Sequence, residues 1–527
     1  MLRLFQRMMQ WHLALPLVSG ILIGTSYIPF PPWASLFCWV PLWIFWTRQT
    51  RLKNVLLGAW VCASVFTLIG FNWVTYTLHE FAHLDWWIAI LGMFLFAILA
   101  HLFVPAAGAL WFFLTRGIRR DSWHSRWIMA LAIVLCQATV PTLFDWNFGY
   151  TWFAANVPIF QWAEVIGFQG LSACTVLSGL MFWTLWESRR RPRGRRILLT
   201  TLVIFLGLNG GGLWLVSRLP TPDALLRVLM VQGNIGNFEK MAAELGGGYQ
   251  DGILKTYMDL TQKGLEGDDP RRIDFALWPE TAFPDFLGEG LKMTPRKETL
   301  SAFLKSHQLA LATGAYGYDF ESGRLTNSLF LLDRNAALVN PHYSKTLLLA
   351  FGEYLPGEEW FPFIRSWLPP IGEFARGEGP TRLIQWNGLR IGAQICYESL
   401  FPEFTRRWAD LGAQFLVNAT NDSWYGTWAE PRQHLMMTLG RAVEVRRPVI
   451  RATNTGISTV GLASGQHLVE SPLHEPWVSV VEIPYVKDPG NTLYQQTYWF
   501  LPLVLWGSFL QLAFSALHAR FKAKSAR

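Results

Sequence analysis

The stretch that decides the fold of the polar half of the chain is LRIGAQICYES, residues 389–399. Its apolar residues predict a short buried strand over 391–395 that ends abruptly at Cys396. A helix-like run then extends from Ser399 to about Leu411. A strand that stops at a reactive side chain and turns into a helix has the outline of a nucleophile elbow. We expect the turn to expose the thiol and the helix N-terminus to favour its thiolate form.

One cysteine alone is weak evidence for catalysis, because free cysteines are most often small buried hydrophobic residues. The other four cysteines of the chain lie in apolar runs: Cys38, Cys62, Cys136 and Cys174. No CxxC pair occurs, which argues against a zinc knuckle and a disulfide framework. The 11 histidines are scattered without an HExxH motif, so we predict no metal and no cofactor.

The composition indicates a membrane protein with a soluble part. Of the 527 residues, 51% are hydrophobic and only 16% are charged, and 28 are Trp and 37 are Phe. These proportions are typical of chains with membrane spans. The net charge of +8 is compatible with nucleic-acid binding, but the positions of the basic residues favour a membrane topology instead.

Apolar runs fill the first 220 residues, and one more closes the chain. A helix needs about 20 residues to cross a hydrocarbon core of roughly 30 Å, so we expect about eight transmembrane helices. The run 86–114 is long and carries Pro105, which is expected to tilt or kink it. The basic N-terminus with its apolar run is interpreted as an uncleaved anchor. The expected spans are 9–29, 34–47, 55–77, 86–114, 127–144, 168–187, 197–216 and 498–517.

Lysine and arginine lie almost entirely on one side of these spans. The loops 30–33, 78–85 and 145–167 contain none. The positive-inside rule therefore places both termini in the cytoplasm and the region between the last two spans outside it, with Arg218 as a single exception. A cytoplasmic loop explains the arginine run 189–196 without a nucleic-acid partner. The basic side comprises Arg3, Arg7, Arg48, Arg51, Lys53, Arg116, Arg119, Arg120, Arg126, Arg189, Arg190, Arg191, Arg193, Arg195, Arg196, Arg520, Lys522, Lys524 and Arg527.

From Pro220 onward, short Val-, Ile- and Leu-rich runs alternate with polar helical stretches, which predicts an α/β domain with a large core. We therefore expect transmembrane helices in 1–219, this domain in 220–495, and a last helix with a cytoplasmic tail in 496–527. Helices are expected near 250–264, 296–307, 399–411 and 430–446. The expected strands are 226–232, 274–278, 309–313, 328–333, 389–395, 414–418, 449–454, 458–463 and 477–482.

Residues suited to acyl chemistry follow the expected strands, where α/β folds place their sites. Glu280 ends DFALWPE, Lys345 ends ALVNPHYSK, and Glu353 lies shortly after it. Together with Cys396 they form a coherent set: a thiolate attacks a carbonyl, a carboxylate moves the protons, and an ammonium stabilises the oxyanion. Each also has a structural alternative, namely a helix's first turn for Glu280, a hairpin surface for Lys345 and an ordinary turn for Glu353.

At these residues the chain resembles a known family. WPE, YSK and ICYES resemble the Glu–Lys–Cys motifs of the nitrilase superfamily, whose fold is a four-layer αββα sandwich. With the spans before and after this domain, nearly the whole chain resembles the apolipoprotein N-acyltransferase family. The most specific pieces are VQGNI at 231–235, WPET at 278–281, FGEYLP at 351–356, ICYE at 395–398, NDSWYG at 421–426 and RATNTGIS at 451–458.

The resemblance implies a role for each motif residue. Glu280 corresponds to the general base, Lys345 to the oxyanion partner and Cys396 to the nucleophile. Glu353 corresponds to a second carboxylate that orients the lysine. The supporting residues beside the nucleophile are Tyr397 and Glu398.

The resemblance also implies a reaction, its partners and a location. The nucleophilic cysteine takes an acyl chain from a membrane phospholipid as a thioester. The N-terminal amine of an S-diacylglyceryl-cysteine apolipoprotein then takes the chain as an amide. Such an enzyme is a multi-pass protein of the bacterial inner membrane with its catalytic domain on the periplasmic side, and it needs no nucleic acid.

Aromatic residues in and after NDSWYG are candidates for a gate or a lipid-facing arm: Trp424, Tyr425 and Trp428. The alternative is that they only pack the edge of the domain. Two positions depart from the family pattern near the expected lipid pocket. Met241 stands where the family usually has a tryptophan, and Ala350 stands where it tends to have a proline.

Two other functions compete with this interpretation. A membrane-anchored nitrilase-type amidase would use the same triad on a small amide, with water as the acceptor. A transporter or receptor would carry ionisable residues inside its spans, and there the sequence offers chiefly His12 and His101.

Overall fold

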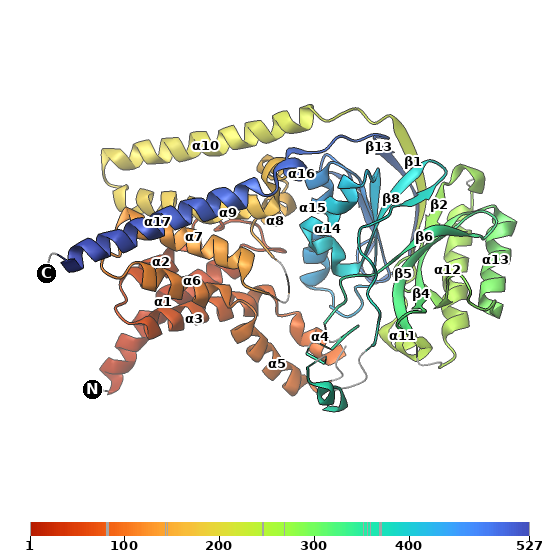
Figure 1. The fold of residues 1–527 in the computed structure, drawn as a ribbon, viewed down its shortest axis with the longest axis horizontal. Coiled ribbons are helices and arrows are strands. Elements are labelled where there is room, and N and C mark those ends of the chain that lie inside the picture. The colour runs from red at the N-terminus through yellow and green to blue at the C-terminus, as the bar shows by residue number, and fades with distance from the viewer. Residues whose placement is uncertain are drawn as a thin grey trace. The chain divides into compact units, whose positions relative to one another are not determined.

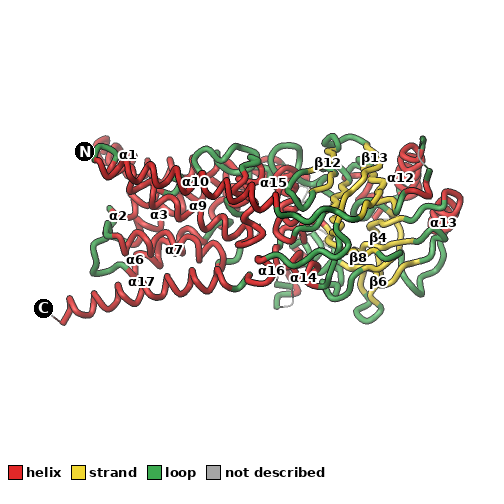
Figure 2. The backbone as a smooth tube through the Cα atoms, turned by 90° about the horizontal axis from the view of Figure 1, so that it is seen from above, coloured by secondary structure: helices red, strands yellow, loops and turns green. Residues whose placement is uncertain are grey.

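The computed structural model describes residues 2–525 except 81–83, 143, 145, 245–246, 268, 351, 356, 359 and 368–371. The chain divides into two compact units, Met1–Arg218 with Gln496–Arg527, and Leu219–Gln495. The first unit is helical, and the strands belong to the second (Figure 2).

Five helical segments of the described chain are long and apolar enough to cross a membrane: Leu52–Gly70, Trp86–Leu114, Pro158–Ser188, Pro192–Ser217 and Phe500–Phe521. They belong to a bundle built around stacked and buried indole rings, such as Trp46 on Trp111 with ring centroids 6.0 Å apart. The helices of this unit are α1 (Leu2–Gly24), α2 (Val40–Thr47), α3 (Leu52–Gly70), α4 (Val74–Glu80), α5 (Trp86–Leu99), α6 (Phe103–Leu114), α7 (Trp123–Thr139), α8 (Gly149–Ala154), α9 (Ala163–Ser188), α10 (Pro192–Ser217) and α17 (Phe500–Ser525).

Three of the eight expected spans, 9–29, 34–47 and 127–144, are not among these five segments. The run 34–47 is helical only over Val40–Thr47, which is too short to cross a bilayer alone. The run 86–114 is among them and has the expected kink, because it divides into α5 and α6, which are separated by residues 100–102. Pro105 explains the break, because its ring clashes with the carbonyl four residues earlier in a continuous helix.

The second unit contains two sheets. One has the strand order β13-β1-β2-β4-β5-β6, with β3 paired to β4, and the other has the order β12-β11-β10-β9-β8-β7. The strands are β1 (Ala224–Gln232), β2 (Phe275–Leu277), β3 (Phe283–Phe286), β4 (Leu311–Asp319), β5 (Arg324–Leu332), β6 (Leu338–Ser344), β7 (Ile384–Trp386), β8 (Leu389–Ile395), β9 (Phe415–Thr420), β10 (Val449–Thr453), β11 (Thr459–Gly461), β12 (His467–Glu470) and β13 (Trp477–Tyr485).

The two sheets pack face to face between two layers of helices (Figure 1). Alternation along β1 shows how the sequence specifies this: Val228 and Met230 join the core between the sheets, and Leu229 and Val231 join the core under the helices. The result is an αββα sandwich, which confirms the expected α/β domain. Its helices are α11 (Asn237–Glu244), α12 (Gln250–Leu265), α13 (Pro295–His307), α14 (Pro402–Asp410), α15 (Glu430–Val445) and α16 (Leu493–Thr497).

The nine expected strands are present, eight of them with shifted ends and 389–395 with the expected ones, and four further strands were not expected. Of these four, β3 and β6 contain Pro284 and Pro341, which weaken a strand pattern in the sequence. The unexpected strand β6 matters most for the site, because it ends directly before Lys345.

Candidate active site

Cys396 begins a short 3-10 helix, Cys396–Leu400, directly after strand β8. Its φ of +56° lies in the left-handed region, which is uncommon for a residue with a side chain and is typical of strained functional positions. The side-chain amide of Asn418 donates to the Cys396 carbonyl at 3.0 Å and holds this turn. The predicted strand–turn–helix is therefore present, although α14 begins only at Pro402.

The expectation that the turn would expose a thiolate is wrong. Cys396 retains only 5% of its accessible surface. Burial raises the pKa of its thiol well above the usual value, and Glu280 raises it further, while Lys345 and a hydrogen bond from Thr420 act in the opposite direction. Because the resting sulfur is a thiol, attack on a carbonyl requires a base that removes its proton.

Glu280 and Lys345 meet in the interior of the same domain. Lys345 Nζ lies 3.2 Å from Glu280 Oε1, and both side chains are almost fully buried. The Asn327 amide donates to the same oxygen, Oε1, at 2.7 Å. These contacts fix the carboxylate through one oxygen and leave Oε2 to accept a thiol proton. Gly314 permits this arrangement, since a Cβ there would lie 2.6 Å from the Glu280 Cα atom.

Glu353 is a second carboxylate on the same lysine. Its Oε1 atom accepts hydrogen bonds from Lys345 Nζ and from the Asn327 amide, both at 2.9 Å. Its other oxygen accepts the Leu349 N–H at 2.8 Å. Although burial opposes a charge on the ammonium, Glu280 and Glu353 together raise the pKa of Lys345 well above its usual value. The lysine is therefore a permanent cation, suited to stabilising an oxyanion.

Glu398 joins the strand ends that carry the lysine and the cysteine. One of its oxygens accepts the N–H groups of Thr346 and Leu347, at 2.7 and 3.0 Å, and the other accepts the N–H of Ile395 at 2.8 Å. The Tyr343 hydroxyl donates to both oxygens. Burial raises the pKa of Glu398 to about 7, against the opposing effect of the three backbone donors.

Tyr397 packs beside the lysine. Its ring centroid lies 5.9 Å from Lys345 Nζ, within range of a cation–π contact, and its hydroxyl donates to the Leu348 carbonyl at 2.8 Å. Tyr397 and Glu398 therefore both bind the segment that follows Lys345. That they support the three candidate catalytic residues stays a prediction.

A buried network behind the nucleophile was not predicted as part of the site. Arg451 donates to Asn418 at 2.8 Å and to Asp422 at 2.5 Å, so it fixes the amide that holds the Cys396 carbonyl. Asn418 stands at the end of an expected strand, and Arg451 begins RATNTGIS, so both had a usable signal in the sequence. Asn327 had none, because it lies inside a strand and gains its role only through the fold.

Asp422, Glu430 and His434 place three possible metal-ligand atoms within 4.8 Å of one another. Arg451 already neutralises Asp422, and His434 Nδ1 lies 3.1 Å from the other Asp422 oxygen. Burial, strengthened by the charge of Asp422, raises the pKa of Glu430 well above its usual value, which favours a neutral carboxyl. A fixed guanidinium beside a neutral acid disfavours a cation, so we assign the cluster to the network behind Cys396.

The aromatic candidates occupy different environments. Tyr425 is buried. Burial raises the pKa of its hydroxyl, and the charge of an ionised Cys396 would raise that pKa further. Tyr425 therefore lies near the candidate nucleophile. Trp424 is half-buried, and Trp428 is exposed. Met241 lies in helix α11, and its side chain falls outside the described part of the structure.

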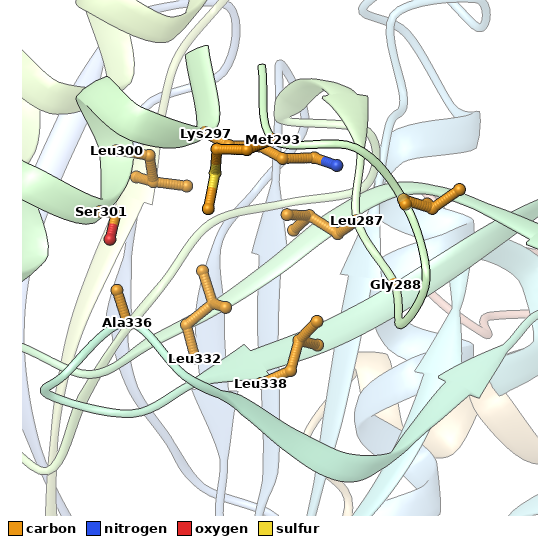
Figure 3. A pocket seen from close by; sticks show the side chains of 10 residues that line it. Leu287, Gly288, Met293, Lys297, Leu300, Ser301, Leu332, Ala336 and Leu338 are labelled. Atoms are coloured by element: carbon orange, nitrogen blue, oxygen red, sulfur yellow. The ribbon is translucent and has the colours of Figure 1, made fainter. Parts of the chain in front are cut away.

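A cavity of about 130 Å³ opens beside helix α13 (Figure 3). None of the three triad residues lines it. The ammonium of Lys297 at this cavity already donates to the Lys292 carbonyl at 2.7 Å. The other walls are mainly leucine side chains: Leu287, Leu291, Leu300, Leu332 and Leu338.

Known proteins match both parts of the chain. Residues 19–181 match the model "Apolipoprotein N-acyltransferase N-terminal domain", and residues 250–487 match "Carbon-nitrogen hydrolase". An apolipoprotein N-acyltransferase of Bdellovibrio bacteriovorus is 41% identical over 491 residues, which cover 91% of this chain and 89% of the relative. One from Geobacter metallireducens is 28% identical over 87% of this chain and 86% of its own length. A solved amidase from Nesterenkonia sp. AN1 aligns with 20% identity and a TM-score of 0.36, over 52% of this chain and 96% of its own.

Proposed function

The chain belongs to the apolipoprotein N-acyltransferase family, and from that premise we propose that Cys396 carries the acyl chain between two lipid substrates. The donor is a membrane phospholipid, and the acceptor is the N-terminal amine of an apolipoprotein that bears S-diacylglyceryl-cysteine. The observation that carries the proposal is the buried pair of Glu280 and Lys345 within electrostatic reach of the thiol, with Glu353 bound to the same lysine.

In the first step, Glu280 accepts the thiol proton and the sulfur attacks the donor's ester carbonyl. The carbonyl electrons move to oxygen, and the Lys345 ammonium stabilises that charge. When the intermediate collapses, the carbon–oxygen bond breaks and the leaving alkoxide takes the proton from Glu280. The products are a lysophospholipid and a thioester on Cys396.

In the second step, the acceptor amine attacks the thioester and Glu280 takes a proton from its nitrogen. The new carbon–nitrogen bond forms, the carbon–sulfur bond breaks, and the proton returns to the Cys396 sulfur. Glu353 positions the lysine through both steps, because it binds the same ammonium from a second direction.

Burial of the nucleophile favours transfer over hydrolysis. Water that reached the thioester would release a free fatty acid, so a transferase must exclude bulk water from the sulfur. An exposure of 5% at Cys396 fits that requirement. The amidase alternative, which needs water as its second substrate, is not favoured.

We further propose an eight-span topology in the bacterial inner membrane. The five long apolar helices support it, together with the one-sided arginines and lysines of the sequence. The transmembrane helices would occupy 1–219 and 496–527, and the catalytic domain, residues 220–495, would lie on the periplasmic side. Trp424, Tyr425 and Met241 would contact the lipid substrates, of which Tyr425 has the best support from its position.

Transfer in vitro tests the proposed function. The purified full chain is mixed with phospholipid labelled in its acyl chains and with a synthetic diacylated lipopeptide. We expect label on the peptide amine from the wild type and none from Cys396→Ala. Label that accumulates only as free fatty acid, with no acylated peptide, would support the hydrolase and overturn the proposal.

A further inference from the structure

An apolar groove of about 320 Å³ runs between helices α9 and α10 in the helical unit, and these helices lie side by side in both views (Figures 1 and 2). The helix α10 packs little against the rest of its unit, since only 6% of its most apolar stretch of 18 residues is buried. The groove is lined chiefly by leucine, isoleucine and aromatic side chains, including Leu171, Phe182, Leu202, Ile204 and Phe205.

The few polar groups of the lining are already satisfied. Thr175 donates to the Leu171 carbonyl at 2.7 Å and accepts the Trp152 indole N–H at 2.9 Å. Ser178 donates to the Thr175 carbonyl, and Thr201 donates to the Ile197 carbonyl. The groove therefore presents hydrocarbon to an occupant and offers it little hydrogen bonding, which suits an alkyl chain.

One end of the groove leads toward the arginine-rich turn 189–196, which comprises the connection 189–191 and the first residues of α10. In the described part of the chain, no acidic side chain forms an ion pair with any arginine of this turn. The acid closest in sequence, Glu187, is bound through both oxygens by Arg126, at 2.8 and 2.9 Å. Positive charge is thus concentrated there without a protein counter-ion.

Helix periodicity places Arg195 on the face of α10 that lines the groove, and Arg189 contacts a tryptophan that follows the lining residues of α9. On α10, Leu202 and Leu198 lie on the groove side, and Arg195 precedes Leu198 by three residues on the same face. On α9, Phe182 is followed four residues later by Trp186, and the Arg189 guanidinium lies 4.0 Å from the centre of the Trp186 ring. The groove therefore offers hydrocarbon to the tail of a lipid, an indole ring to its interfacial region and guanidinium groups to its headgroup, in that order.

We propose that this groove binds one acyl chain of an anionic phospholipid whose phosphate contacts Arg189 and Arg195. A groove of about 320 Å³ accommodates part of an acyl chain. Basic pockets between transmembrane helices on the cytoplasmic side commonly bind anionic headgroups. The assignment rests on the proposed topology, which places this turn on the cytoplasmic side. The bound lipid would brace α10 against α9.

Native mass spectrometry of the full chain in detergent tests this, with phosphatidylglycerol and phosphatidylethanolamine as separate probes. We expect the wild type to retain phosphatidylglycerol preferentially. The double variant Arg189→Ala/Arg195→Ala should weaken that binding roughly 25-fold, about fivefold for each arginine. The matched control Arg48→Ala/Arg51→Ala removes two arginines from another cytoplasmic loop and should leave it unchanged.

Cross-linking a photoreactive lipid to the wild-type protein provides a second test that does not depend on whether the variants fold. Phosphatidylglycerol with a diazirine in mid-chain should label peptides that contain 171–182 and 198–208 above all other spans. Equal retention of the two lipids, or labelling spread evenly over the spans, would overturn the proposal. Acyl-adduct formation at Cys396, followed in the same samples, separates this site from catalysis: we expect the arginine variant to lose the lipid and keep the adduct.

Discussion

Replacing Glu398 by alanine tests how the nucleophile and the lysine are held together. The Glu398 carboxyl is the shared acceptor for backbone N–H groups on both sides of the site: Thr346 and Leu347 directly follow Lys345, and Ile395 directly precedes the cysteine. Alanine would remove the acceptor and leave three N–H groups without it, of which that of Ile395 is buried and the other two are partly buried.

The size of the effect follows from those contacts. A buried donor left unsatisfied costs about 1–3 kcal/mol, so the three donors give at most roughly 3–9 kcal/mol before water enters the vacated space. We expect the free energy of unfolding to fall by about 4 kcal/mol. Without the hydrogen bonds to the Glu398 carboxyl, the turn at Cys396 can also shift. A displacement of about 1 Å lowers the rate of thioester formation roughly 100-fold.

The assay is the rate at which the Cys396 thioester forms, with urea unfolding measured in parallel. Tyr343→Phe is the matched control, because it removes one donor to the Glu398 carboxyl and leaves the backbone hydrogen bonds intact. We expect that control to lose about 1 kcal/mol of stability and less than tenfold in rate. Wild-type acylation by Glu398→Ala, or an equal loss in both variants, would refute the reasoning.

Three further outcomes follow from the site. Gly314→Ala would push Glu280 away from the thiol, since the new Cβ would lie 2.6 Å from the Glu280 Cα atom; we expect at least a tenfold slower acylation and about 1–3 kcal/mol lower stability by urea unfolding, and a wild-type rate would contradict this. Because burial raises the Cys396 pKa, iodoacetamide should alkylate it slowly at pH 7 and faster at each step up to pH 10, and a plateau below pH 8 would disprove a buried thiol. The pKa of the Glu398 carboxyl is about 7 in the folded protein, above its value in the unfolded chain, so protonation of this group stabilises the folded state. This contribution to the free energy of unfolding is complete below the unfolded pKa. Urea unfolding should show it declining as the pH rises from about 4.5 to 7, and Glu398→Ala should show no such decline.

Strand and helix positions in the α/β domain could be predicted because each segment has a clear local pattern. Residues 389–395 form a strand with the predicted ends, and 250–264 differs from helix α12 by one residue. β6 was missed because its sequence, LVNPHYS, mixes polar residues with a proline and is stabilised by pairing with β5. The division of 86–114 into two helices, by contrast, follows from one proline in a long apolar run, which the sequence shows directly.

In the candidate site, the sequence indicated which residues are candidates for the chemistry and failed to indicate their protonation. The motif order pointed to Glu280, Lys345 and Cys396, and the structure places the first two 3.2 Å apart. The thiolate expectation considered only the turn and the helix, whereas burial by both sheets and helices decides the pKa of the sulfur. Asn327 was not predicted, because only strand pairing in the folded domain brings its amide into hydrogen-bonding distance of the Glu280 and Glu353 carboxylates.

The most direct test of the account is the intact mass of the full chain after incubation with phospholipid alone. We expect the wild type to gain the mass of one fatty-acyl group, which neutral hydroxylamine removes as expected for a thioester, and Cys396→Ala to gain none. An equal adduct on Cys396→Ala, or no adduct on a wild type that still acylates the lipopeptide, would contradict a covalent intermediate on Cys396.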